Sequence, residues 1–112
     1  MMATTKKVLG QVFPSPSTVT ELYATSDNTE VVFSTIFCCN QNTEVDDTFS
    51  IAVRPTADAL DTKHVIYFHE PLPALRTYAI TCGITLGANY TIEVTSINGT
   101  TSFSGFGQET TA

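Results

Sequence analysis

The chain has 112 residues, 42% of them hydrophobic, which predicts one globular domain. Only 14% of the residues are charged, well below the roughly 25% of an average soluble domain, and Thr and Ser together make up a quarter of the chain. Because the net charge is −6, with only five basic residues, we expect neither nucleic acid nor an anionic membrane as a partner.

Short apolar runs with alternating character follow one another along the chain, and none of them has the period of a helix. The run 30–39 is the most apolar and is expected to be a central strand, whereas 48–54 alternates as a half-buried strand does. Residues 57–60 suffice for one helical turn at most. The eight predicted strands cover residues 6–12, 19–24, 30–39, 48–54, 64–69, 76–82, 90–97 and 100–106.

Turn residues separate the predicted strands. Prolines end the first strand within residues 13–16 and the fifth within residues 70–73, since proline cannot lie in a central strand. Asn98-Gly99 is a strong signal for a two-residue hairpin, so strands 90–97 and 100–106 are expected to pair. Gly105 and Gly107 indicate a bulge or close packing near the end of the last strand.

This series of short strands predicts an all-β fold, an eight-stranded antiparallel β-sandwich that is jelly-roll-like or immunoglobulin-like. The absence of Trp lowers the weight of a true immunoglobulin domain. We divide the single domain into an N-terminal arm with the first strand (1–16), the sandwich (17–108) and a polar tail (109–112) that is expected to be frayed.

The sequence offers little for catalysis. His64 and His69 lie at an odd separation, so a regular strand would place them on opposite faces, where they cannot share a metal. Glu44, Asp46 and Asp47 form an acidic cluster, for which a solvated charged turn is a better interpretation than a Ca²⁺ loop. Nucleophile-elbow and phosphate-loop motifs are absent, so we expect no catalytic residue, no metal and no cofactor.

The cysteines Cys38, Cys39 and Cys82 are odd in number, and no two have the CxxC spacing of a redox or metal site. We expect them to be small buried side chains of a protein that folds in a cytoplasm. Residues 1–10 also lack the apolar run of a signal peptide.

A binding or structural role fits the composition better, because surfaces with few charges lose little hydration when they meet. Aromatic and lysine side chains are the candidates for contact with a partner. The competing interpretation is burial in the core for each aromatic residue and protection of an edge strand for the lysines. The candidate partner-interface residues are Lys6, Lys7, Phe13, Pro14, Pro16, Phe33, Phe37 and Phe68.

An ordered series of short segments resembles the small virion proteins of tailed bacteriophages, of the type seen in phages of marine cyanobacteria. The series spans nearly the whole chain, and its order and spacing carry the resemblance more than any single segment. The segments are KVLGQ (7–11), TVTELY (18–23), VFSTI (32–36), CN (39–40), FSIAVRP (49–55), KHVIYF (63–68), GITL (83–86) and SFSGFGQE (102–109).

The resemblance implies a non-enzymatic structural protein of a phage particle, assembled in the host cytoplasm. The first expectation is a capsid decoration or cement protein, a homo-oligomer, with a trimer favoured, whose partner is the major capsid protein. Its N-terminal segment would be an arm ordered on assembly, with Lys6 and Lys7 facing an acidic partner surface.

Two alternatives stay open. The first is a tail, baseplate or fibre component with tail proteins as partners, in which a loop aromatic such as Tyr90 stacks on a carbohydrate. The second is a small enzyme or ligand-binding barrel, which would require a pocket that holds His64 or His69 together with an acid.

Overall fold

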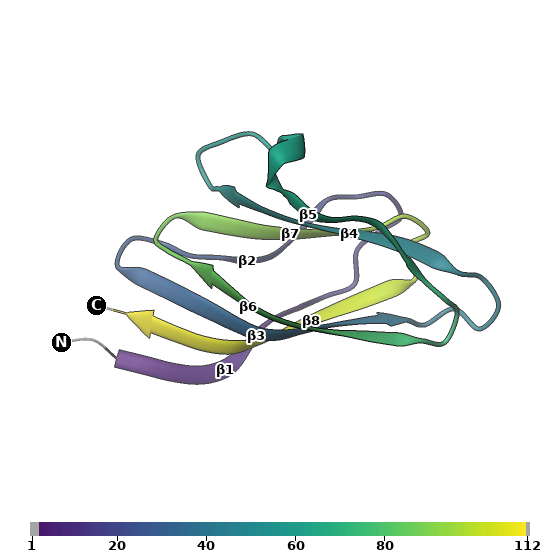
Figure 1. Ribbon diagram of the computed structural model, residues 1–112, viewed down its shortest axis with the longest axis horizontal. Coiled ribbons are helices and arrows are strands. Elements are labelled where there is room, and N and C mark those ends of the chain that lie inside the picture. Colours follow the sequence, from purple (N-terminus) through teal and green to yellow (C-terminus); the bar gives the residue numbers. More distant parts are fainter. Residues whose placement is uncertain (1–2, 112) are drawn as a thin grey trace.

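The structure is a computed structural model that describes residues 3–111, apart from the side chain of Cys82. It is nearly all β, as the alternation of the sequence predicts (Figure 1). The single described helical segment is the 3-10 turn η1 (Thr62–His64). The strands are β1 (Ala3–Val12), β2 (Thr20–Ala24), β3 (Thr29–Asn40), β4 (Asp47–Pro55), β5 (Val65–Leu72), β6 (Thr77–Leu86), β7 (Tyr90–Ser96) and β8 (Thr101–Thr111).

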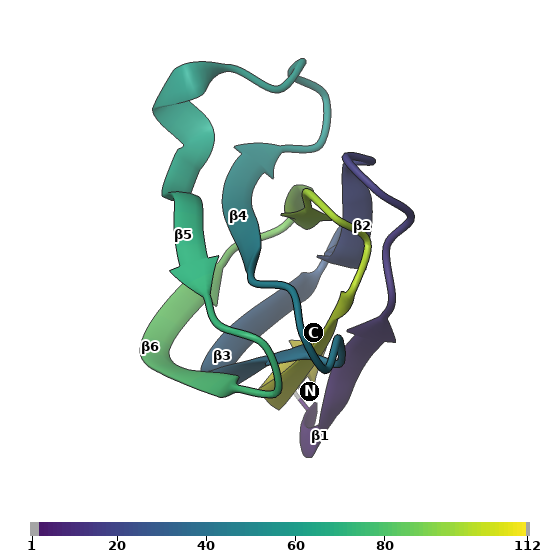
Figure 2. The same ribbon diagram turned by 90° about the vertical axis from the view of Figure 1, so that its right-hand side faces the viewer.

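The strands form two four-stranded antiparallel sheets, sheet A in the order β1-β8-β3-β6 and sheet B in the order β2-β7-β4-β5 (Figure 1, Figure 2). β1 pairs with β8, β2 with β7, β3 with β6 and β4 with β5. Such nested pairs arise when one long hairpin is rolled up, and β3·β8 and β4·β7 contacts then complete the sheets. This order is a jelly roll, so of the two sandwiches that the sequence left open the immunoglobulin order is excluded.

The core lies between the two sheets and is built from alternate strand positions. Phe49 of β4 and Phe103 of β8 are fully buried and meet edge to face across the two sheets, with ring centroids 6.0 Å apart. Phe33 of β3 is also fully buried and meets Tyr23 of β2 in the same geometry at 6.1 Å. The aromatic rings thus connect both sheets through one core.

The predicted hairpin at Asn98-Gly99 is wrong. β7 belongs to sheet B and β8 to sheet A, so these residues carry the chain from one sheet to the other. A type I′ turn requires positive φ at both residues, and of the two only Gly99 has it, at 70°. The ring of Pro16 packs against Gly99 so closely that a Cβ there would lie 2.6 Å from it.

Both chain ends described by the structure are strands of sheet A, which corrects the predicted arm and tail. Thr111, the last described residue, pairs with Ala3 of β1 on one side and with Thr29 of β3 on the other. A Thr-rich segment suits a strand, and pairing on both sides satisfies its backbone groups. Neither β1 nor residues 109–111 therefore form a segment separate from the sandwich, while Ala112 lies outside the described residues.

Three further boundaries differ from the prediction. β5 continues through Pro71, which an edge strand accepts because one side of its backbone needs no donor. β6 continues past Gly83, whose φ of 57° forms a bulge opposite Ser34. The helical turn lies at Thr62–His64 instead of 57–60, because Asp61 caps it with its side chain.

Close packing explains two glycines of β8, as the sequence indicates. A Cβ on Gly105 would lie 2.5 Å from the ring of Phe33, and one on Gly107 would lie 2.0 Å from the carbonyl oxygen of Val32. Both positions therefore need a residue without a side chain.

Candidate interaction surfaces

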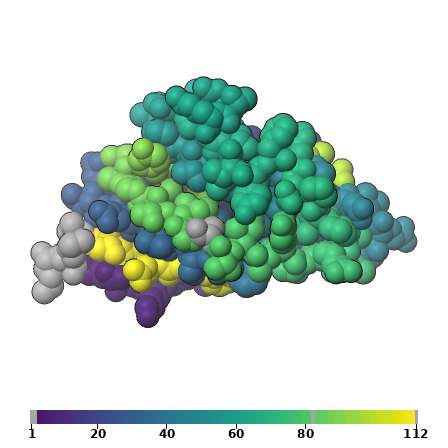
Figure 3. Space-filling view, viewed as in Figure 1, coloured from purple at the N-terminus to yellow at the C-terminus, as the bar shows by residue number. Residues whose placement is uncertain are grey.

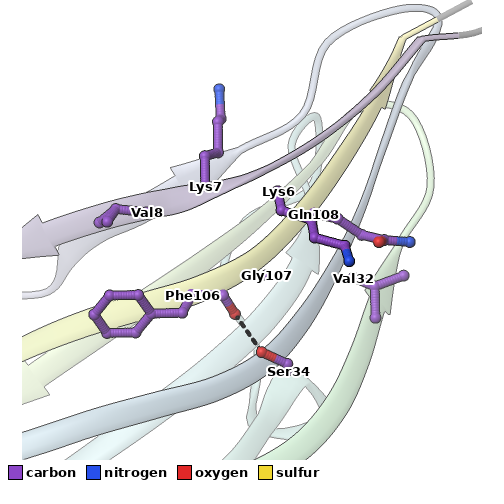
Figure 4. A pocket seen from close by; sticks show the side chains of 8 residues that line it. All are labelled: Lys6, Lys7, Val8, Val32, Ser34, Phe106, Gly107 and Gln108. Carbon is purple, nitrogen blue, oxygen red and sulfur yellow. Dashed lines mark hydrogen bonds between the residues drawn. The ribbon is translucent and has the colours of Figure 1, made fainter.

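An open groove of about 630 Å³ lies on sheet A (Figure 4). Its apolar members Val8 and Phe106 alternate along their strands with the buried Leu9 and with Gly105, which faces Phe33, so they lie on the face turned away from sheet B. Residues of β1, β3 and β8 line the groove: Lys6, Lys7, Val8, Val32, Ser34, Phe106, Gly107 and Gln108.

Two β-bulges shape this groove. The register shifts between Val8 and Gly10 in β1 and again between Phe33 and Thr35 in β3, and both shifts face the same part of β8. Bulges bend a strand and increase its twist, so two of them on either side of one strand curve the sheet locally. The hydroxyl of Ser34, the extra residue of β3, donates to the carbonyl oxygen of Phe106 at 3.2 Å and fixes the bulge (Figure 4).

The apolar surface continues along sheet A beyond the groove. Phe37 of β3 is 39% exposed, and its ring meets that of Phe106 edge to face at 5.6 Å. The neighbouring outward side chains are uncharged: Gln11 donates to Ser104 at 3.4 Å, and Gln41 donates to Ser102 at 3.1 Å. Beyond the groove, the outer face of sheet A thus presents the ring of Phe37 among polar groups that carry no charge.

The two neighbouring lysines of β1 have different surroundings. Lys7 forms an ion pair with Glu109 of β8 at 3.1 Å, whereas Lys6 has no ion-pair partner among the described residues. The two side chains leave β1 in different directions, and that of Lys6 runs over the groove toward Gln108 (Figure 4). Lys6 therefore supplies the positive charge of the groove, and Lys7 is neutralised within the chain.

The sequence predicts Lys6 as an interface residue but misses Phe106. The sequence does contain a signal for an outward Phe106, because Phe103 and Phe106 lie three residues apart in one strand and must face opposite sides of the sheet. With Phe103 in the core, Phe106 has to face outward. Phe33 is the opposite case, since its complete burial makes its assignment to an interface wrong.

The remaining candidates are dispersed. Phe13 follows β1 and is 58% exposed, Pro14 is buried, and Pro16 packs on Gly99. Phe68 lies on the other sheet and is 70% exposed. The structure therefore does not bring these four residues together with the groove.

A second, smaller cavity of about 200 Å³ lies on sheet B beside Phe68. Its apolar members include Val19, Leu60 and Ile97, for which the sequence predicts no interface role. The connection between β4 and β5, which contributes Leu60, forms a prominence at the top of Figure 3. Arg54 fastens this connection through an ion pair with Glu93 at 2.7 Å and by donating to loop carbonyl oxygens.

The two histidines have separate roles. His64 is buried, and its Nδ1 accepts from the amide of Asp61 at 2.9 Å as part of the cap of η1. His69 is exposed, has a φ of 49° and stacks on Phe68 with ring centroids 4.1 Å apart. Within residues 3–111, the side chain of Cys82 excepted, no group of three or more Asp, Glu, His or Cys side chains is placed to hold a metal ion.

Cys38 is buried in the core, as predicted, whereas Cys39 is half-buried and the side chain of Cys82 lies outside the described part. Burial raises the pKa of the Cys38 thiol to about 12. This thiol is therefore protonated at neutral pH and packs as a small apolar group.

Asp47 corrects the prediction of a solvated acidic turn, because it is only 1% exposed. Its carboxylate accepts from the hydroxyls of Ser96 and Thr101, the latter at 2.5 Å. It also accepts from the amides of Asn98 and Thr48 at 2.9 and 2.8 Å. Burial raises the pKa of this carboxyl, and the hydrogen bonds outweigh burial, so the pKa lies below its ordinary value.

These contacts place Asp47 at the point where the chain crosses from β7 to β8. Ser96 is the last residue of β7 and Thr101 is the first of β8, so one carboxylate joins the ends of strands from both sheets. Asp46 and Glu44 of the same cluster are exposed. Asp47 is thus a structural residue of the crossover.

Among the described residues no helix has the length and apolarity that a membrane span requires. The chain was also compared with protein-family models, with curated proteins and with solved structures, and no match was found.

Proposed function

We propose that the protein is a non-enzymatic structural component of a bacteriophage particle that decorates or cements the capsid. The observation that supports the proposal best is the outer face of sheet A, where Phe106 lines an open groove and Phe37 contacts it from the neighbouring, uncharged polar surface. Such a surface loses little hydration when it meets another protein. The resemblance of the sequence to small virion proteins supplies the context of the particle.

In this proposal the partner is the major capsid protein. The two aromatic rings act as anchors, since aromatic residues carry much of the energy of protein interfaces. Lys6 faces an acidic group of the capsid, because it is not neutralised within the described residues. Many copies bound to one shell add up weak contacts into lasting attachment.

The copy number in purified virions tests this function. Quantitative mass spectrometry is expected to find copies on the order of the number of capsid subunits. A handful of copies per particle would contradict a role in decorating the capsid.

Binding of the purified protein to particles that lack it tests the surface. Phe106→Ser removes one anchor from the groove, and we expect at least about tenfold weaker binding, which is ~1.4 kcal/mol. Phe68→Ser is the matched control, since it removes an exposed ring from the other sheet. Equal losses in both variants would contradict the assignment of the groove as the contact surface.

A tail, baseplate or fibre component is the second candidate. The observation that favours it is the exposure of aromatic rings away from the groove, with Tyr90 38% exposed and Phe68 stacked on His69. Exposed rings of this kind can stack on a carbohydrate. Antibody labelling confined to the tail of the virion would support this candidate, and labelling over the head would exclude it.

A further inference from the structure

Unlike the other three edge strands of the sandwich, one edge strand carries neither a charged residue nor a proline. An edge strand exposes unpaired backbone groups, and proteins guard such edges with charges, proline, bulges or short length. β1 carries Lys6 and Lys7, β2 has only five residues including Glu21, and β5 contains Glu70 and Pro71. β6 has ten residues without a charge or a proline, and its bulge at Gly83 lies beyond the segment from Thr77 to Thr81, which pairs with β3 in an unbroken register.

The direction of the free backbone groups of β6 follows from its pairing with β3. The amide of Asn40 donates to the carbonyl oxygen of Arg76 at 2.9 Å, and the register then runs without a break from Thr77 to Thr81. In an antiparallel pair successive residues turn their N–H and C=O groups alternately toward the partner strand and away from it. Thr77, Ala79 and Thr81 therefore turn both groups away from β3, toward the open edge.

We propose that this edge pairs with β6 of a second copy of the chain, antiparallel and about a twofold axis at Ala79. Thr77 then lies opposite Thr81 of the second copy, and Ala79 lies opposite its own counterpart. These are the residues with free outward groups, so the three opposed pairs exchange about six backbone hydrogen bonds. The free groups of one copy thus match those of the other without any change of backbone.

The alternatives to this register are less complete. A twofold axis at Tyr78 or at Ile80 also places residues with outward N–H and C=O groups opposite one another. Each of these registers, however, forms only two such residue pairs within residues 77–81, compared with three for the axis at Ala79. A third pair would require Leu75 for the axis at Tyr78 and Gly83 for the axis at Ile80, and these residues have φ values of 62° and 57°. Neither has the extended backbone that a ladder requires.

Side chains agree with the same register. Tyr78 lies opposite Ile80 of the second copy, which is a favourable aromatic and β-branched pair, and Thr77 opposite Thr81 is a favourable pair of threonines. Tyr78 contacts Phe49 at the rim of the core and is still 40% exposed, so a neighbouring strand would cover it further. Although each chain has a net charge of −6, no charged residue of one β6 faces another.

We infer a second copy as the partner because the outward backbone groups of Thr77, Ala79 and Thr81 complement themselves about a twofold axis, and such a contact requires a self-complementary surface. The pairing is twofold and thus differs from the trimer that the sequence resemblance implies. β6 and β1 are opposite edges of sheet A, so the groove beside β1 stays open in the dimer. Strand pairing about an axis perpendicular to the sheet leaves the grooves of both copies on the same side, ready for two contacts with one surface.

Solution mass is the first test. A short paired edge buries a small area, so we expect a weak dimer, with the mass rising from 12.1 kDa toward twice that value between about 10 µM and 1 mM protein in sedimentation equilibrium. A mass that stays at 12.1 kDa over this range would overturn the proposal. A trimer mass would overturn it as well.

Charges at the twofold axis test the register. In an Ala79→Lys chain two lysines would face each other, and in an Ala79→Glu chain two glutamates would, so each alone is expected to dimerise at least about tenfold more weakly. An equal mixture of the two is expected to restore the dimer, since opposite charges then meet. A mixture that stays monomeric, or an Ala79→Lys chain that dimerises like the parent, would refute the register.

Two further variants separate dimerisation from folding. Thr85→Lys adds the same charge to β6 beyond the bulge, outside the paired segment, and is expected to leave the dimer unchanged. Ala79→Pro removes an N–H that β3 does not use, so the monomer is expected to unfold at nearly the parent's temperature while dimerisation is lost. Loss of the dimer in Thr85→Lys, or a full dimer in a folded Ala79→Pro chain, would contradict the proposed contact.

Discussion

Removal of the buried carboxylate of Asp47 is expected to loosen the crossover between the sheets. The carboxylate receives four hydrogen bonds, two from hydroxyls and two from backbone amides. In an Asp47→Ala chain the hydroxyls of Ser96 and Thr101 lose this acceptor inside the protein, because both residues are fully buried. The crossover then holds unpaired donors where the parent holds an ionic network.

The magnitude follows from these contacts. A hydrogen bond to a charged group contributes roughly 1.5–3 kcal/mol, and each buried donor left unpaired costs about 1–3 kcal/mol. The buried hydroxyls can rotate toward other acceptors, and loss of the carboxylate removes its own desolvation penalty, so these values do not simply add. We expect Asp47→Ala to lower the free energy of unfolding by about 3–5 kcal/mol.

The isosteric Asp47→Asn chain separates charge from shape. Its amide oxygen can still accept from a backbone amide, and rotated hydroxyls of Ser96 and Thr101 can accept from its NH₂ group. We therefore expect a smaller loss, of about 1–2 kcal/mol. That loss measures the contribution of the negative charge.

The contribution of this charge depends on pH. The pKa of Asp47 is lowered in the folded protein, so the folded state binds a proton less readily than the unfolded state. Its stabilisation is complete above the unfolded pKa of about 3.9 and is lost as the pH falls through the lower folded value. The difference in stability between the parent and Asp47→Asn is therefore expected to shrink in acid.

Urea denaturation between about pH 7 and pH 2.5, followed by circular dichroism, measures these differences. A loss below about 1 kcal/mol for Asp47→Ala at neutral pH would refute the idea that the carboxylate holds the crossover. A difference between the parent and Asp47→Asn that is the same at all pH values would refute the contribution of its charge.

Three further perturbations test the packing. Gly105→Ala places a Cβ against the fully buried Phe33 and is expected to lower the free energy of unfolding by about 1–3 kcal/mol. The control Gly87→Ala, where no atom lies within 4 Å of the added Cβ, should change it by less than ~0.5 kcal/mol. Equal effects of the two variants in urea denaturation would contradict this packing. Phe33→Ala should cost about 3–5 kcal/mol and the half-exposed Phe37→Ala under ~1.5 kcal/mol, and the reverse order would place the core elsewhere. Arg54→Ala is expected to speed proteolysis within the β4–β5 connection that it fastens, and an unchanged cleavage rate would contradict that role.

The strands themselves could be predicted because side-chain alternation is a local property. In β4 the apolar Phe49 and Ile51 alternate with Ser50, and the structure buries both apolar residues completely. The same rule, applied to β8, would also have placed Phe106 on the outer face. For the same reason, the outward position of Lys6 in the groove could be predicted from the sequence.

Which strands pair with each other could not be predicted from the sequence. Asn98-Gly99 has the composition of a hairpin turn, but Asp47, far upstream in the chain, holds the ends of β7 and β8 in different sheets. The polar end of the chain reads as a frayed tail, although Thr111 has a paired strand on either side. Both outcomes depend on residues distant in sequence, which no local pattern contains.

The sequence by itself therefore determined a β-sandwich, a charge-poor surface and most strand positions, because alternation and composition act within a few residues. Tertiary structure alone decided the jelly-roll order, the groove and the open edge at β6. The groove arises where bulges in β1 and β3 face the same part of β8, and the free edge arises from the place of β6 in sheet A. Each of these features depends on which strands meet, since hydrogen bonds between distant segments set the register and leave β6 at an edge of its sheet.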